Sequence, residues 1–209
     1  MRNRTVIRAI TRCALASGVA IPVLYYGIQA VAAPFFPGFS FLETTASELG
    51  SDRSRCANIF NHGVISLGVL MLFASCGFFE AFRRPGTFPV LGWLAALGIA
   101  MTGVQTVGAG YYPLPDPRHA GQPVFLVAML LLPVVLAIAM WPLSRWGLKL
   151  YFILNLVLLV TMVPLMSAMS GIDTHAYRGG LQRVFALTVF PPIGVAACAL
   201  LKRTRSAEA

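Results

Sequence analysis

The sequence predicts an all-α fold: an integral membrane bundle of six transmembrane helices that forms a single domain over residues 1–209. Three observations support this fold class. Hydrophobic residues make up 57% of the chain and charged residues only 11%, about half the charge of a soluble domain. Apolar runs of about 20 residues, long enough to cross a bilayer as helices, recur along almost the whole chain. The polar stretches between these runs are too short to form a separate soluble domain.

The expected helices cover residues 14–36, 57–82, 88–112, 123–141, 150–170 and 181–201. The first follows four arginines and contains Ala-Val-Ala-Ala at residues 30–33, so it is either a cleaved secretory signal or a retained helix. Its length and the polar Tyr25, Tyr26 and Gln29 favour retention. Cleavage would leave five helices.

The later helices carry local signals of packing and position. Gly92, Ala96 and Ala100 are spaced by four, so they share a face on which a second helix can approach closely. Pro191 and Pro192 should kink the last helix. A short turn with Arg145 and Lys149 separates the fourth and fifth helices, and tryptophans 141 and 146 suit the membrane interface there.

The basic residues predict that both chain termini are cytoplasmic. With the N-terminus inside, the cytoplasmic segments carry eleven of the 16 lysines and arginines, and the outer segments carry five. The net charge of +9 is therefore assigned to helix orientation and to anionic lipid headgroups. Nucleic acid is excluded as a partner, because its binding needs a basic stripe on a folded surface. We expect a multi-pass protein of the cell membrane, with a prokaryotic inner membrane favoured.

Three polar stretches, residues 41–52, 111–121 and 171–183, fall on the outer side in this topology. They contain five of the seven carboxylates and two of the three histidines. The third histidine, His62, follows shortly after the first stretch. Polar chemistry is thus predicted to gather on one side of the membrane.

The same stretches resemble a known family. The relevant segments are residues 36–50 with Ser-Glu-Leu-Gly at 47–50, Asn-His-Gly at 61–63, residues 108–119 ending in Asp-Pro-Arg-His, and Gly-Gly-Leu-Gln-Arg at 179–183. Together they resemble the bacterial and archaeal multi-spanning proteins grouped as domain of unknown function 998. The resemblance covers nearly the whole chain and implies a six-helix membrane protein. It implies no particular activity, so no catalytic roles are carried over from it.

The leading functional hypothesis is a membrane enzyme that acts on a lipid or isoprenoid-like substrate at headgroup level. The candidate acid/base residues are Glu48, Asp116, His119 and His175. A carboxylate at the membrane edge is partly desolvated, which suits it to proton transfer. The candidate substrate-binding residues are Arg183, Gln182, Glu43 and His62, with Arg183 holding an anionic group.

Each of these residues also has a purely structural interpretation. Glu48 could cap a short surface helix that starts at Thr45 or Ser47. Arg183 could extend its guanidinium to the lipid headgroups. The histidines could be solvated interfacial residues.

A metal site is the other chemical alternative. His119, His175, Asp116 and Asp173 offer nitrogen and oxygen ligands to zinc or another divalent ion. None of these pairs has the i, i+4 helical spacing of a strong zinc motif. Two functions without catalysis remain open beside the enzyme. One is a subunit that binds a partner membrane protein or forms a homo-oligomer, and the other is a small transporter or channel. Membrane lipids are expected partners in every case.

Overall fold

The computed structural model describes residues 2–83, 87–166 and 173–206 and shows six long helices. They are α1 (Arg2–Ala32), α2 (Ala57–Ala81), α3 (Pro89–Tyr111), α4 (Pro123–Met140), α5 (Trp146–Met166) and α6 (Arg178–Ser206). Short 3-10 turns separate some of them: η1 (Ala33–Phe35), η2 (Ser47–Gly50), η3 (Pro117–Ala120), η4 (Trp141–Leu143) and η6 (His175–Tyr177). All six helical segments are long and apolar enough to span a membrane, which confirms the predicted fold class.

The observed helices are longer than predicted at several ends. α1 begins at Arg2 instead of residue 14, and α6 covers Arg178–Ser206 instead of 181–201. A helix continues past its apolar run because its backbone hydrogen bonds do not depend on side-chain polarity. The assigned α6 helix is unbroken through Pro191 and Pro192. The predicted end of the fifth helix, residues 167–170, lies outside the described residues.

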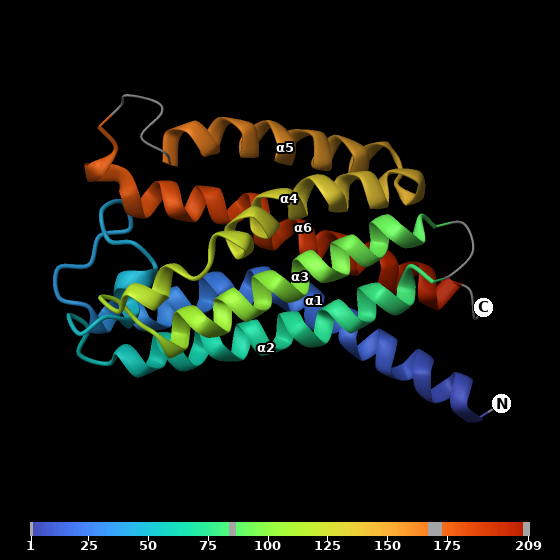
Figure 1. Ribbon diagram of the computed structural model, residues 1–209, viewed down its shortest axis with the longest axis horizontal. Helices are drawn as coiled ribbons and strands as arrows, with labels where there is room; N and C mark the ends of the chain where they lie inside the picture. Colours follow the sequence, from blue (N-terminus) through green and yellow to red (C-terminus); the bar gives the residue numbers. More distant parts are fainter. Residues whose placement is uncertain (1, 84–86, 167–172, 207–209) are drawn as a thin grey trace.

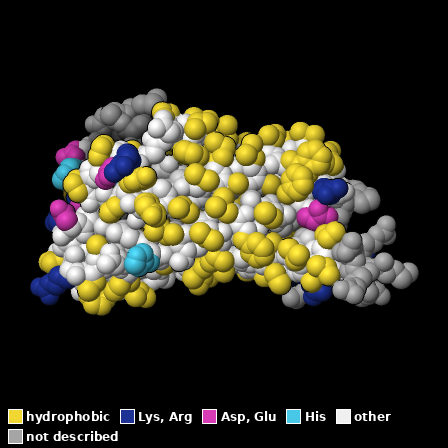
Figure 2. Space-filling model, turned by 60° about the horizontal axis from the view of Figure 1, so that its bottom comes forward, with side chains coloured by type: hydrophobic (Ala, Val, Ile, Leu, Met, Phe, Trp, Pro, Cys, Tyr) yellow, Lys and Arg dark blue, Asp and Glu magenta, His cyan; other side chains and the backbone are white. Residues whose placement is uncertain are grey.

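The helices run back and forth along one long axis, so alternate connections meet at the same end (Figure 1). Both chain termini lie at one end of the bundle. The connections α1–α2 and α3–α4, and residues 173–177 before α6, lie at the opposite end, which we call the loop end. The described residues of the three polar stretches, 41–52, 111–121 and 173–183, therefore share one end, as predicted. In the view of Figure 2, hydrophobic side chains form a broad band between charged side chains at the two ends.

The interior of the bundle is built from aromatic and aliphatic side chains of all six long helices. Phe78, Phe82, Met71 and Phe152 are almost fully buried in this main cluster. Burial of such large apolar side chains in close packing supplies the van der Waals contacts that hold helices together in lipid. A second, smaller cluster at the loop end includes Phe36, Leu49 and Phe60, and it anchors the α1–α2 connection.

Helices α2 and α3 approach closely where both carry glycine. A Cβ atom added to Gly68 would lie 2.6 Å from the carbonyl oxygen of Gly103, and one added to Gly103 would lie 2.9 Å from the carbonyl oxygen of Gly68. Gly92 instead packs against the ring of Phe82, and Ala96 is buried. The small face predicted on α3 is therefore used for packing, with reciprocal backbone contact at Gly103.

Helix α1 supplies part of the core. Leu15 and Ile21 are fully buried, and the Cβ atom of Ala14 lies against Gly77 of α2. One turn further along α1, Gly18 lies against Ala197 of α6. Loss of α1 would expose apolar surfaces of both neighbouring helices.

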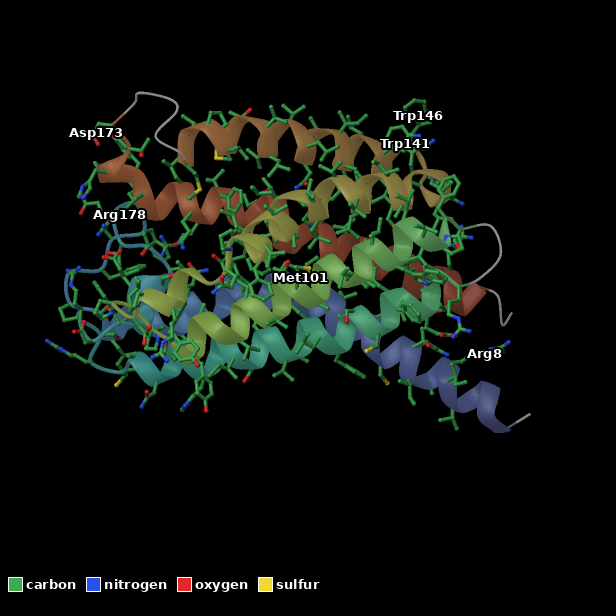
Figure 3. The ribbon with its side chains drawn as sticks, in the orientation of Figure 1. Arg8, Met101, Trp141, Trp146, Asp173 and Arg178 are labelled. Atoms are coloured by element: carbon green, nitrogen blue, oxygen red, sulfur yellow. The ribbon has the colours of Figure 1, made fainter. Side chains whose placement is uncertain are left out.

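The turn from α4 to α5 lies at the end that carries the chain termini. Figure 3 shows Trp141 and Trp146 together at this turn, with Arg8 at the same end of the molecule. The ammonium group of Lys149 lies 5.0 Å from the ring centre of Trp141 and 5.7 Å from that of Trp146. Lysine and tryptophan together suit the membrane interface, as the sequence suggested.

Candidate functional site

Glu48 is the most heavily hydrogen-bonded carboxylate at the loop end. It is 9% exposed and lies in the first turn of η2. Its Oε2 accepts hydrogen bonds from the backbone nitrogen of Thr45 at 2.7 Å and from its hydroxyl at 2.9 Å. Its Oε1 accepts from Arg178 at 2.8 Å and from Arg53 at 3.2 Å.

The pairing of Thr45 with Glu48 is a reciprocal capping box. The backbone nitrogen of Glu48 lies 3.4 Å from the Thr45 hydroxyl, while the Glu48 carboxylate accepts from the backbone nitrogen of Thr45. This matches the capping interpretation of Glu48. The sequence did not identify Arg178 as the ionic partner, because the two residues are 130 positions apart.

Arg183 holds the α1–α2 connection against α6. Its Nη1 donates to the carbonyl oxygens of Phe41 and Thr44, both at 2.8 Å. Its guanidinium carbon lies 5.5 Å from the ring centre of Phe39 and 5.2 Å from that of Phe41. The main chain of Arg183 is tied to α1, because the Tyr26 hydroxyl donates to its carbonyl oxygen at 2.9 Å.

Neighbouring residues of α6 add further contacts to the same connection. The backbone nitrogen of Gly180 donates to the Leu42 carbonyl oxygen at 2.9 Å, and Gly179 packs directly against the Thr44 carbonyl. Arg178 donates through Nε to the Glu43 carbonyl oxygen at 3.1 Å. Glu43 thus contributes its backbone here, and its side chain is exposed.

Gln182 links the α1–α2 connection to a cavity. Its Oε1 accepts a hydrogen bond from the backbone nitrogen of Ala46 at 2.6 Å. Gln182, Ala46 and Ser47 all line a partly open cavity of about 480 Å³. This volume lies in the range of sites that bind small molecules.

The cavity walls are mainly apolar and come from all six long helices. Phe60, Val64, Met129, Phe185 and Phe190 are representative of the apolar lining. The polar lining comes from residues of α1, η2, α3, η3 and the start of α6: Tyr25, Ser47, Gln105, Thr106, His119 and Gln182. Three of these, Ser47, His119 and Gln182, belong to the three polar stretches at the loop end. The cavity is therefore amphipathic, with hydrogen-bonding groups near the loop end.

His119 is the histidine that lines the cavity. Its Nδ1 lies 2.9 Å from the carbonyl oxygen of Tyr112. Because a carbonyl oxygen only accepts, Nδ1 must carry a proton, and in the neutral imidazole Nε2 is an acceptor. Gln105 fixes the main chain at this point by donating to the His119 carbonyl oxygen at 3.2 Å.

The remaining candidates lie outside the cavity. His62 and His175 are exposed. Figure 3 places Asp173 at the loop end, where its carboxylate accepts from the backbone nitrogen of His175 at 3.0 Å. That contact is a local turn of the chain and involves no imidazole nitrogen.

Asp116 is paired within its own loop. Its carboxylate accepts two side-chain hydrogen bonds from Arg118, at 3.0 and 2.6 Å, and a third from the Arg118 backbone nitrogen. The side-chain hydrogen bonds to Arg118 lower the pKa of Asp116 to about 2. A carboxylate that remains ionised to such low pH is poorly suited to proton transfer near neutrality.

The proposed metal ligands are not brought together. Among the residues that the structure describes, no group of three or more His, Cys, Asp or Glu side chains could hold a metal ion. The four proposed ligands make other contacts. Asp116 pairs with Arg118, and the Asp173 carboxylate accepts a hydrogen bond within its own loop. His175 is exposed. Of the acid/base candidates, His119 lines the cavity, whereas Glu48, Asp116 and His175 do not.

Sequence reasoning missed Ser47, Gln105 and Thr106 as cavity residues, and Arg53 and Arg178 as partners of Glu48. Gln105 and Thr106 carry a weak signal, since they are adjacent polar residues within an otherwise apolar helix. The arginines carry no local signal that separates them from the other interfacial arginines.

Comparison with known proteins gives a family. The family model described as "Protein of unknown function (DUF998)" matches residues 19–199, which include the second half of α1, most of α6 and everything between them. The chain matches no curated protein and no solved structure. The chain belongs to the DUF998 family of proteins of unknown function.

Proposed function

We propose that this membrane protein binds an amphipathic lipid, isoprenoid-like or acyl, with its apolar chain among the helices and its headgroup at the loop end. The observation that carries the proposal is the amphipathic cavity of about 480 Å³. Apolar side chains form most of its wall, and its hydrogen-bonding residues include Ser47, His119 and Gln182. This is the distribution of lining groups that a lipid chain with a polar end requires.

The surroundings of the cavity support a lipid ligand over a water-soluble one. The lining comes from helices that are each apolar enough to span a membrane. A ligand with a long apolar chain would gain van der Waals contact with Phe185, Phe190 and Met129. A small polar solute would not make these van der Waals contacts with the apolar side chains of the wall.

If the bound lipid is also transformed, His119 is the residue placed to take part. Its Nδ1 is bonded to the Tyr112 carbonyl, so its Nε2 is the ring nitrogen left for a ligand. Glu48 and Arg183 have a structural role in this proposal. Their contacts hold the part of the cavity wall that carries Ala46 and Ser47 against α6. The outward orientation of this end, with both termini cytoplasmic, is part of the proposal.

The test is native mass spectrometry of the protein purified in mild detergent, followed by extraction and analysis of bound lipid. We expect about one lipid per chain for the wild type. Ala109 lines the cavity, so Ala109→Phe should fill it and lower lipid occupancy at least about tenfold. The matched control is Val160→Phe on α5, at a site that is 73% exposed, where occupancy should be unchanged.

Two results would contradict the proposal. One is a wild-type protein that carries no lipid after mild purification and takes up none from added membrane lipid. The other is equal lipid occupancy in Ala109→Phe and Val160→Phe, which would assign the bound lipid to the outer surface of the bundle.

A further inference from the structure

The cavity presents no carboxylate, ammonium or guanidinium group from its described lining residues to a ligand. Among its described lining residues there is no Asp, Glu, Lys or Arg. Its polar side chains are hydroxyls, amides and one imidazole, from Tyr25, Ser47, Thr106, Gln105, Gln182 and His119. A buried anionic headgroup needs a paired cation, whereas an uncharged headgroup needs only hydrogen-bond partners.

The nearby arginines are already committed to protein partners. Arg178 donates to the Glu48 carboxylate and to the Glu43 carbonyl oxygen. Arg53 donates to Glu48 as well. Arg183 donates twice through Nη1 to the carbonyl oxygens of the α1–α2 connection.

The unpaired nitrogens of Arg183 do not alter this conclusion. Its Nε and Nη2 are buried and have no hydrogen-bond partner among the described residues. They belong to a guanidinium that lies within 5.5 Å of the ring centres of both Phe39 and Phe41. Arg183 does not line the cavity, and its guanidinium lies beside these two aromatic rings.

The hydrogen-bonding capacity left at the polar end suits a hydroxyl group. His119 offers Nε2 as an acceptor, because Nδ1 is the nitrogen bonded to the Tyr112 carbonyl oxygen. Gln182 uses Oε1 to accept from the Ala46 backbone nitrogen, so its amide NH2 group remains as a donor. A hydroxyl is the smallest headgroup that both donates and accepts.

We infer that the lipid bound in this cavity is an uncharged alcohol whose hydroxyl donates to Nε2 of His119. This inference rests on the proposed function, since it names the headgroup class of the same lipid. Gln182 and Ser47 are the neutral groups that complete the site around the hydroxyl oxygen. A phosphate or carboxylate headgroup is disfavoured because it would face the His119 acceptor without a paired cation.

The experiment compares three probes with the same C15 isoprenoid chain: farnesol, farnesyl monophosphate and farnesene, which has no headgroup. Binding to the full chain in detergent micelles is followed by competition with a radiolabelled farnesol. We expect farnesol to bind about tenfold more tightly than farnesene, as one additional hydrogen bond can provide. Farnesyl monophosphate should bind at least about tenfold more weakly than farnesol.

The His119→Asn variant tests the residue itself. Asparagine can still donate to the Tyr112 carbonyl oxygen, but it has no atom in place of Nε2. Farnesol should fall to the affinity of farnesene in this variant, and farnesene affinity should stay at the wild-type value. The unchanged farnesene affinity also shows that the variant is folded.

The outcomes separate this inference from the proposed function. Absence of binding by all three probes would overturn both. Binding of farnesene and farnesol with equal affinity, or tightest binding of farnesyl monophosphate, would overturn the alcohol headgroup and leave the lipid cavity standing. Retention of the farnesol preference in His119→Asn would overturn the role of His119.

Discussion

Replacement of Arg183 by alanine should destabilise the loop end substantially. Two charge-assisted hydrogen bonds to the carbonyl oxygens of Phe41 and Thr44 would be lost, each worth about 1.5–3 kcal/mol. Two aromatic contacts, with Phe39 and Phe41, would add about 0.5–1 kcal/mol each. Because Arg183 is half-buried, solvent screening lowers the total, and we expect a loss of about 2–4 kcal/mol.

The measurement is the unfolding temperature in detergent, followed by tryptophan fluorescence. A loss of about 2–4 kcal/mol corresponds to a decrease of roughly 4–16 °C for a chain of this size. Limited proteolysis should also show faster cleavage in residues 40–46, since the carbonyl clamp on this segment is gone. Arg183→Lys should recover only part of the loss, because an ammonium group lacks the planar guanidinium that lies beside both rings.

Arg55→Ala is the matched control. Arg55 is exposed at the same end, and no hydrogen bond or ion pair of its side chain occurs among the described residues. Its replacement should change stability by less than about 0.5 kcal/mol. If Arg183→Ala and Arg55→Ala unfold at the same temperature, Arg183 only extends to the headgroups, and the clamp described above is refuted.

Two further predictions concern the same contact between the α1–α2 connection and α6. Glu48→Ala should cost about 2 kcal/mol, because a buried capping box and two arginine contacts are lost together. The control is Glu80→Ala, which breaks a partly exposed ion pair with Arg83 and should cost about 0.2–1 kcal/mol. Equal unfolding temperatures for Glu48→Ala and Glu80→Ala would contradict the stabilising role of the Glu48 contacts. Gly179→Ala should destabilise by about 1–3 kcal/mol, because the new Cβ would overlap the Thr44 carbonyl. The control is Gly147→Ala, whose new Cβ meets no atom within 4 Å and should stabilise α5 by up to about 1 kcal/mol. If Gly179→Ala is as stable as Gly147→Ala, the close packing of Gly179 against the Thr44 carbonyl is not required.

The fold could be read from the sequence because each transmembrane helix is specified locally. In a bilayer, a long apolar run must satisfy its backbone hydrogen bonds internally, and a helix does so without help from distant residues. Six apolar runs therefore predicted α1 to α6, and alternation of direction placed the three polar stretches at one end (Figure 1). The ends of the helices were predicted less well, since α1 and α6 extend beyond the hydrophobic runs.

The sequence named several residues that have specific partners at the loop end, but it left their roles open. Glu48, Gln182, Arg183 and His119 were all candidates, and all have specific partners at the loop end. The capping interpretation of Glu48 was available locally because Thr45 is three residues earlier, whereas the ion pair with Arg178 spans 130 residues.

By itself, therefore, the sequence determined the helix number and the shared end of the polar stretches, because apolar length is a local property. It offered the capping box as one of two interpretations of Glu48. Only the tertiary structure decided that α6 clamps the α1–α2 connection and that His119, and not His62 or His175, lines the cavity. These features depend on which face each helix turns toward its neighbours. That choice is made by packing between segments far apart in the chain, such as the reciprocal contact of Gly68 with Gly103.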